Sequence, residues 1–268
     1  MGIQRCDNTL CNTSLFVSVV IPVFNCEKYV EDSINSVINQ SFTDFELIIV
    51  DDASTDHTPE ILRQYQEKDP RIKVIRQNRN VGVAKSRNVG FDHSRGKLIA
   101  LLDADDYWHS DKLKKQVDTL IKTKADLVYC SYEIVDEKGT NICDDFIVPQ
   151  TTSLEETLKQ NVINCSTALF KSEIVQKHRF KSDYYHEDLV FWIDLLKDHV
   201  KVFGLRDVLA AYRIVNGSRA SDKLRSAQNR YLVLRDYLKL PLYKRTEIML
   251  SYAVKAIMKY KFKRKLRS

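Results

Sequence analysis

The chain has 268 residues, of which 44% are hydrophobic and 29% are charged. This is enough for one large or two small globular domains, and the low counts of Gly (7) and Pro (5) argue against long linkers and low-complexity regions. The net charge of +6 is concentrated in residues 244–268, which hold nine Lys or Arg and one acid, whereas the rest of the chain holds 33 basic and 35 acidic residues. This division disfavours a protein that binds nucleic acid over its whole surface.

Cysteine usage and hydropathy indicate a protein of the cytoplasm. The six cysteines have no CxxC spacing, which favours a reducing compartment, although Cys6 and Cys11 could pair or bind a metal. No segment reaches the roughly 18 to 20 apolar residues of a membrane span. The apolar run 15–24 contains Pro22 and follows a neutral leader, so it predicts a strand and not a signal peptide. The N-terminus lacks the Ser or Thr of a myristoylation site.

The first hundred residues alternate between buried strands and amphipathic helices. Apolar, β-branched runs predict strands, and helical spacing or capping residues predict helices. The strands are expected at 16–23, 45–50, 72–76 and 98–102, and the helices at 27–39, from Thr58 onward with Pro59 in the first turn, and at 83–94. This order predicts a parallel sheet with helices on both faces.

The second half has a less regular pattern. A helix with a capping box begins at Ser153, and a strongly apolar helix begins at Leu189, after His186-Glu187-Asp188. Further expected elements are strands at 127–135 and 166–170, edge strands at 200–203 and 209–213, a turn at 136–139, and helix after Ser221.

Three of the expected strands end in polar or acidic residues. These ends are 22–25, Asp51-Asp52 and 103–106. In open α/β sheets, ligands bind beyond the carboxyl ends of the strands, so these residues should converge. A single acid such as Asp56 or Asp111 could merely cap a helix, but three polar ends at one edge are hard to explain in that way.

The stretch IALLDADDYW, residues 99–108, runs from a buried strand into three carboxylates. Like charges this close repel, and each costs desolvation when it is partly buried. A positive partner is therefore expected, and a metal ion is the simplest candidate.

Four motifs in this order resemble the inverting family 2 glycosyltransferases of bacterial polysaccharide biosynthesis, which have the GT-A fold. The motifs are VSVVIPVFNCEKYVEDSINSVINQSFTDFELIIVDDASTD, NVGVAKSRNVG, LLDADD and HEDLVFW, and the resemblance covers roughly Phe16 to Arg219. It implies an α/β fold, with a Rossmann-like mixed sheet flanked by helices and a helical C-terminal tail. We expect a leader (1–14), a nucleotide-sugar-binding half (15–110), an acceptor-binding half (111–220) and a basic helical segment (221–268).

The resemblance implies a metal-dependent enzyme that transfers a sugar from a UDP-sugar, with glucose, galactose or an N-acetylhexosamine as the sugar. The DxD motif, Asp103-Ala104-Asp105, would bind the nucleotide. Asp105 would ligate Mn²⁺ or Mg²⁺, and Asp103 would lie near the ribose and the metal. The cation would neutralise the charge that develops on the departing diphosphate. Asp106 either assists or caps the following turn.

The remaining nucleotide contacts are also implied by the resemblance. Phe24 stacks on the base or packs in the core, and Asp52 accepts a hydrogen bond from the uracil ring, while Asp51 binds turn amides. Lys85 and Arg87 reach phosphate, unless Arg87 is a plain surface residue of a helix. The other residues expected in the nucleotide pocket are Pro22, Val23, Asn25 and Glu27. Arg213 or Arg219 would offset the negative charge of the leaving group.

Asp188 matches the general base of the family, and Glu187 would orient it or contact the acceptor. An inverting transfer needs one such base and no covalent intermediate. The alternative is that both acids only cap the following helix. Trp192 is more plausible as a core residue than as a sugar-stacking platform.

The basic tail carries aromatic and aliphatic anchors, including Tyr252 and Phe262. Such a segment can lie in an anionic membrane interface, or it can be a solvated terminal helix. Family members of this size suggest a polyprenyl-diphosphate-linked acceptor for O-antigen, capsule or a teichuronic-type polymer, which places the protein at the inner face of the plasma membrane.

Two other functions fit the sequence less well. A nucleotidyltransferase needs a Gly-rich phosphate loop after the first strand, and IPVFNCEKY has no Gly. A non-catalytic sugar-nucleotide-binding or scaffold protein would lack Asp103, Asp105 or Asp188, and all three are present.

Overall fold

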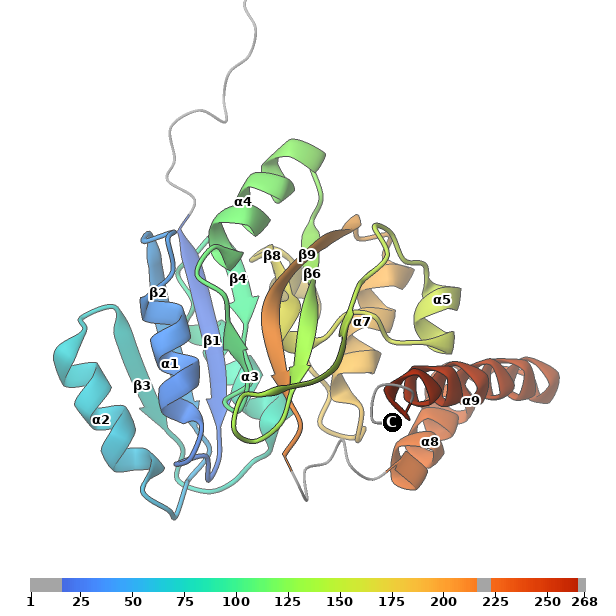
Figure 1. The fold of residues 1–268 in the computed structure, drawn as a ribbon, viewed down its shortest axis with the longest axis horizontal. Coiled ribbons are helices and arrows are strands. Elements are labelled where there is room, and N and C mark those ends of the chain that lie inside the picture. The colour runs from blue at the N-terminus through green and yellow to red at the C-terminus, as the bar shows by residue number, and fades with distance from the viewer. Residues whose placement is uncertain (1–15, 216–222, 265–268) are drawn as a thin grey trace, which may run out of the picture.

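The computed structural model describes residues 16–215 and 223–264, with side chains for 16–215 and 224–255. The predicted leader with Cys6 and Cys11, the alternative leaving-group residue Arg219 and the side chain of Phe262 lie outside the described residues. Within them, nine strands form one mixed sheet in the order β3-β2-β1-β4-β8-β6-β9-β5, with β7 paired to β6 (Figure 1).

The strands are β1 (Val17–Val23), β2 (Phe45–Asp51), β3 (Ile72–Arg76), β4 (Leu98–Leu101), β5 (Tyr107–Trp108), β6 (Leu127–Val135), β7 (Asn141–Phe146), β8 (Leu169–Lys171) and β9 (Val202–Arg213). The helices are α1 (Val30–Ile38), α2 (Thr58–Lys68), α3 (Val83–His93), α4 (Lys112–Thr123), α5 (Leu154–Lys159), α6 (Ile174–Lys177), α7 (Glu187–Lys197), α8 (Lys223–Leu232) and α9 (Leu242–Arg264). A 3₁₀ turn, η1 (Cys165–Thr167), and a π-helical turn, η3 (Val233–Tyr237), complete the described elements.

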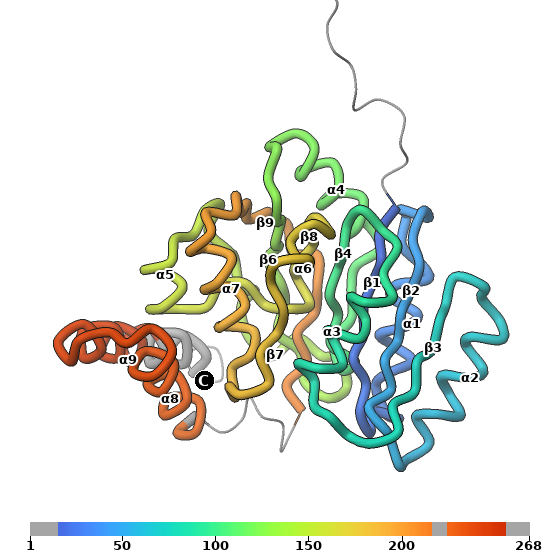
Figure 2. Tube along the Cα trace, turned by 180° about the vertical axis from the view of Figure 1, so that it is seen from behind, coloured from blue at the N-terminus to red at the C-terminus, as the bar shows by residue number. Residues whose placement is uncertain are grey.

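The parallel half of the sheet is as predicted. β3, β2, β1 and β4 are parallel, and Val17 of β1 lies opposite Phe45 of β2 and Leu98 of β4. β1, β2 and β4 are buried along their whole length, because helices cover both faces of the sheet. α1 and α4 lie on one face and α3 and α7 on the other, as the two opposite views show (Figures 1 and 2).

The second half differs from the prediction at several points. The two expected edge strands are one strand, β9, which lies inside the sheet between β6 and β5. The exposed residues Arg206 and Asp207 interrupt its apolar pattern where the register with β6 shifts, and this made one strand look like two. The expected strand 166–170 is divided between η1 and β8. Helix α7 begins two residues earlier than predicted, at Glu187.

Four elements were not predicted: β5, α4, β7 and α6. The capping box at Ser153 was correct, since its hydroxyl accepts a hydrogen bond from the backbone N–H of Glu156, whose carboxylate accepts one from the N–H of Ser153. The predicted helical segment after Ser221 consists of α8, η3 and α9, with a break before Leu242.

The C-terminal helices form a unit at the end of the molecule opposite α2 (Figures 1 and 2). A third apolar cluster joins η3 and α9 to α5 and α7 through residues such as Leu158, Val190, Val233 and Ile248. Trp192 on α7 is a core residue with no exposed surface, as expected. None of the described helices is long and apolar enough to cross a membrane.

Candidate active site

A cleft of about 730 Å³ lies at the carboxyl ends of the strands, where convergence was predicted. Its walls come from the ends of β1, β2, β4 and β9 and from the loop that leads into α3. Its lining residues are Pro22, Phe24, Asn25, Cys26, Tyr29, Asp52, Asn80, Gly82, Val83, Arg87, Asp103, Ala104, Asp105, Tyr212, Arg213 and Val215.

The end of β1 supplies an aromatic wall to this cleft. Phe24 is 47% exposed and lines the cleft, so the alternative that it packs in the core is wrong. Pro22 and Asn25 line the cleft beside it, whereas Val23 is buried behind them. Glu27 does not line the cleft, and its carboxylate accepts a hydrogen bond from the backbone N–H of His57 at the start of α2. An exposed aromatic ring at this position is suited to stacking on a flat ligand.

The two acids at the end of β2 have different surroundings. Asp51 is buried, and its carboxylate accepts a hydrogen bond from the backbone N–H of Ser54 in the turn, as predicted. Asp52 lines the cleft, and its two carboxylate oxygens accept hydrogen bonds of 2.8 Å from the backbone N–H groups of Val81 and Gly82. Gly82 has a φ of 90°, which a residue with a side chain rarely adopts. This loop therefore holds the Asp52 carboxylate in a fixed orientation at the cleft wall.

Asp103, Ala104 and Asp105 line the cleft, but Asp106 does not. The carboxylate of Asp106 is buried and accepts hydrogen bonds from the hydroxyl of Ser166 and from the backbone N–H of Arg213. Burial, followed by the negative charges of Asp105 and Asp103, raises the pKa of Asp106 well above its usual value. Asp106 therefore stabilises the turn. This agrees with the second of its two predicted roles, in which it caps the turn and does not assist directly at the site.

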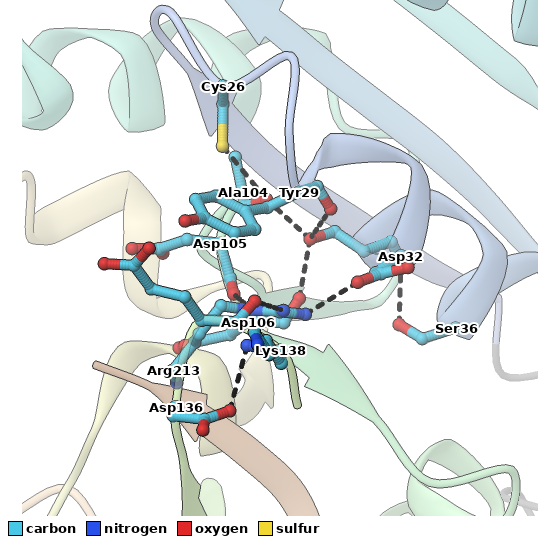
Figure 3. A network of polar contacts seen from close by, with 12 residues as sticks. Cys26, Tyr29, Asp32, Ser36, Ala104, Asp105, Asp106, Asp136, Lys138 and Arg213 are labelled. Carbon is cyan, nitrogen blue, oxygen red and sulfur yellow. Dashed lines mark hydrogen bonds and ion pairs between the residues drawn. The ribbon is translucent and has the colours of Figure 1, made fainter. Parts of the chain in front are cut away.

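Arg213 ties this turn to the rest of the molecule (Figure 3). Its Nε donates to the carbonyl of Asp105 at 2.8 Å, and its Nη1 donates to the carbonyl of Glu137 at 2.9 Å. Its Nη2 lies 2.7 Å from a carboxylate oxygen of Asp32 on α1. The guanidinium also lies 4.9 Å from the ring centroid of Tyr29. Arg213 lines the cleft as predicted, but each guanidinium nitrogen already has a protein partner.

The two cleft-facing carboxylates suit a cation that arrives with a diphosphate. Among the described residues, no group of three or more His, Cys, Asp or Glu side chains could hold a metal by itself. Mg²⁺ and similar cations are usually held by one or two carboxylates together with substrate phosphates and water. Asp103 and Asp105, both partly exposed to the cleft, provide a donor set of that kind.

A second pocket of about 180 Å³ adjoins the cleft. It is lined by Arg87, Asp103, Asn164, Cys165, Tyr185, His186, Glu187, Asp188 and Tyr212. Arg87, Asp103 and Tyr212 line both spaces, so they form a shared wall. The predicted nucleotide residues and the predicted base are thereby brought to two sides of one wall, although 85 residues of chain separate Asp103 from Asp188.

Asp188 lies in the first turn of α7 and is held by its neighbours. One carboxylate oxygen accepts a 3.0 Å hydrogen bond from the amide of Asn161. Burial, followed by the negative charge of Glu187, raises the pKa of Asp188, and the nearby His186 and Arg87 oppose this rise. A carboxylate with a raised pKa in a pocket can act as a general base nearer to neutral pH.

Arg87 is buried, with only 3% of its side chain exposed, so it is not a plain surface residue. One terminal nitrogen lies 2.6 Å from Asp103 and the other 2.9 Å from Glu187. Lys85, two residues earlier on the same helix, is exposed and lines neither pocket. The structure therefore groups Arg87 with the two pockets and leaves Lys85 and Glu27 outside them.

Several residues in or beside the pockets were given no individual role from the sequence. Tyr212 lies in the shared wall, and its place next to Arg213 at the end of a strand was the available signal. Cys26 contacts the carbonyl of Ala104 through its thiol, and burial raises the pKa of that thiol to about 12, so it stays protonated. Asn161 lies in a loop 27 residues before Asp188, and no sequence pattern connects the two.

Comparison with known proteins identifies the family. The model of glycosyl transferase family 2 matches residues 18–178. TuaG of Bacillus subtilis, a glycosyltransferase with a provisional assignment to teichuronic acid biosynthesis, is 35% identical over 93% of this chain and 99% of its own length. WfgD of Escherichia coli is 30% identical over 92% of this chain and 95% of its own length, and is named a UDP-Glc:α-D-GlcNAc-diphosphoundecaprenol β-1,3-glucosyltransferase.

Solved structures agree on the fold. Residues 1–349 of TarS from S. aureus, crystallised with UDP-GlcNAc, align with a TM-score of 0.70 and 22% identity over 88% of this chain and 71% of that chain. A mannosyltransferase from Pyrobaculum calidifontis, in complex with GDP-Man and Mn²⁺, aligns with a TM-score of 0.66 and 19% identity over 88% and 68%. Both share the mixed sheet that the motifs predicted. The chain belongs to glycosyl transferase family 2, has the GT-A fold and is a glycosyltransferase.

Proposed function

We propose that the protein transfers glucose, galactose or an N-acetylhexosamine from its UDP conjugate, with inversion, to a hydroxyl of a polyprenyl-diphosphate-linked saccharide during synthesis of a surface polysaccharide. The observation that carries this proposal is the wall shared by the two pockets. This wall, to which Asp103 belongs, has Asp105 on the side of the large cleft and Asp188 on the side of the small pocket. The large cleft belongs mainly to residues 15–110, and the small pocket mainly to residues 111–220.

The large cleft suits the nucleotide. Phe24 offers an exposed ring for stacking on the uracil, and the Asp52 carboxylate, fixed by the amides of Val81 and Gly82, can accept a hydrogen bond from the ring N–H. Asp103 and Asp105 would hold Mn²⁺ or Mg²⁺, which as a Lewis acid would neutralise charge on the departing diphosphate.

The small pocket suits the acceptor. Asp188 would remove the proton from the attacking hydroxyl as the new glycosidic bond forms, and Asn161 holds one of its carboxylate oxygens in place. The name of WfgD describes an acceptor linked to undecaprenol diphosphate. A relative from Campylobacter jejuni, 28% identical over 88% of this chain, is named for a similar acceptor. These names support a lipid-linked acceptor.

A donor screen tests the activity. With Mn²⁺ and a panel of UDP-sugars, we expect slow release of UDP from one donor, which EDTA abolishes and added Mn²⁺ restores. Asp105→Asn should lower that rate by about 10²-fold or more, because one carboxylate ligand is lost. Asp118→Asn, at an exposed acid on α4, is the matched control and should keep the wild-type rate. If no UDP-sugar turns over and calorimetry detects no binding of UDP, the proposed function is wrong.

We also propose that α9 contacts the inner face of the plasma membrane. Tyr243, Leu250 and Val254 are 68%, 63% and 49% exposed, and their spacing of seven and four residues places them on one side of the helix. Ile248, on another side, is buried against the body of the protein. The excess of Lys and Arg after residue 243 complements an anionic surface. An apolar side chain stripe with basic neighbours is typical of an interfacial helix.

Vesicle co-sedimentation tests this contact. The double variant Leu250→Ser, Val254→Ser should bind vesicles that contain phosphatidylglycerol about 10-fold more weakly than the wild type, because two apolar anchors are removed. Ile121→Ser is a matched control, since Ile121 is 55% exposed on α4, remote from α9. Equal binding by the double variant and the wild type would exclude α9 as the contact.

A further inference from the structure

Arg87 is the side chain that connects the two halves of the candidate site. It projects from α3, and its two terminal nitrogens contact Asp103 of the turn after β4 and Glu187 at the start of α7. Both carboxylates are held within 3 Å, and Arg87 lines both pockets. The guanidinium also lies 4.9 Å from the ring centroid of Phe180. This places one cation between the nucleotide side and the acceptor side.

The geometry argues against phosphate binding as the main role of Arg87. Both of its terminal nitrogens are occupied by carboxylates, and its Nε is buried without a hydrogen-bond partner among the described residues. Only 3% of the side chain is exposed, and its two ion pairs aim both terminal nitrogens at carboxylates, so a phosphate would have to compete with Asp103 and Glu187 for this guanidinium. A buried charge is retained only where its partners are well placed, and here the partners are the residues next to the chemistry.

We propose that Arg87 is a positioning residue, which fixes Asp103 and Glu187 across the shared wall and balances the negative charge of Glu187, so that the adjacent Asp188 is ionised and ready to act as base. This inference rests on the proposed function, because it takes Asp188 as the base.

The charges around Asp188 come from several elements. Glu187 and His186 lie beside it in the chain, Arg87 faces it from α3, and Arg230 faces it from α8. Asp103 and the buried thiol of Cys165 line the same pocket. Glu187 raises the pKa of Asp188, whereas His186 and Arg87 lower it. Loss of Arg87 would leave Glu187 and Asp188 as adjacent acids with less positive charge nearby, and like-charged acids in one site do not both ionise readily.

The test is the pH dependence of kcat/KM for the acceptor. In Arg87→Met, we expect kcat to fall by about 10²-fold and the acid limb of the profile to move up by about one pH unit. Arg87→Lys keeps the positive charge but cannot contact both carboxylates through two separate nitrogens. Its acid limb should stay near the wild-type position, with a smaller loss of kcat. The double variant Arg87→Met, Glu187→Gln removes both charges, so its acid limb should return toward that of the wild type.

Glu187→Gln alone tests the same idea with Arg87 in place. The neutral amide can still accept a hydrogen bond from the guanidinium, so the fold should be kept and the acid limb should move to lower pH. The proposal would be overturned if the acid limb of the pH profile of kcat/KM has its wild-type position in both Arg87→Met and Glu187→Gln. A rise in donor KM with unchanged kcat in Arg87→Met would also overturn it, in favour of phosphate binding.

Failure of the proposed function would look different. If Asp188→Asn keeps its activity, the base assignment itself is wrong, whatever Arg87 does. If Asp188→Asn is inactive but the Arg87 and Glu187 variants leave the acid limb unmoved, only the positioning role is wrong.

Discussion

Replacing Asp188 by Asn is expected to lower kcat by about 10²- to 10⁴-fold, with little change in KM for the UDP-sugar. The amide has the shape of the carboxylate but cannot take the proton of the acceptor hydroxyl. KM for the UDP-sugar should stay near the wild-type value, because Asp188 lines the small pocket and does not line the large cleft. Steady-state kinetics at saturating acceptor, with calorimetric binding of UDP, measure both quantities.

Asp183→Asn is the matched control for this change. Asp183 is an exposed acid five residues before Asp188, and it lines neither pocket. Its replacement should leave kcat unchanged. A kcat for Asp188→Asn within tenfold of the wild type would mean that another group accepts the proton, and Glu187 in the same pocket would be tested next.

Arg213→Met is expected to lower the free energy of unfolding by about 3 kcal/mol, because removing one partner of a buried charged pair leaves polar groups unsatisfied. The side chain of Arg213 is only 3% exposed, and its nitrogens hold Asp32 and the carbonyls of Asp105 and Glu137 (Figure 3). Asp32 itself is 59% exposed, which places the expected loss at the lower end of the range for buried pairs. Urea denaturation of the two proteins provides the comparison.

The same change should also impair the enzyme. Without Arg213, the turn that bears Asp105 loses its link to α1 and β9, so KM for the metal should rise. Arg235→Met is the control, because Arg235 pairs with its exposed neighbour Asp236 and should give no measurable change in stability. A loss below 1 kcal/mol for Arg213→Met would show that the turn is held mainly by Asp106 and its hydrogen bonds.

Local patterns in the sequence were sufficient for the parallel half of the fold. The runs 17–23 and 45–50 are mostly apolar, and a strand of this kind has few alternatives to burial on both faces of a parallel sheet. Because parallel strands share one carboxyl edge, the meeting of Asp52 with Asp103 and Asp105 followed from the order of the elements. The prediction for the second half was wrong where pairing with distant strands decided the position of a strand in the sheet. β9 lies inside the sheet because β6 and β5 pair with its two sides, and no local pattern reports this.

The sequence by itself determined the family, the parallel arrangement of the first half and which acids follow the strands at their carboxyl ends. Only the tertiary structure decided what the arginines do. Arg87 contacts Glu187 across 100 residues, and Arg213 contacts Asp32 across 181 residues. An arginine in a motif can face a phosphate or a buried carboxylate, and the choice depends on which charge the folded chain brings within hydrogen-bonding distance. That distance is set by packing between elements far apart in the sequence, so it cannot be found from the spacing of residues within a motif.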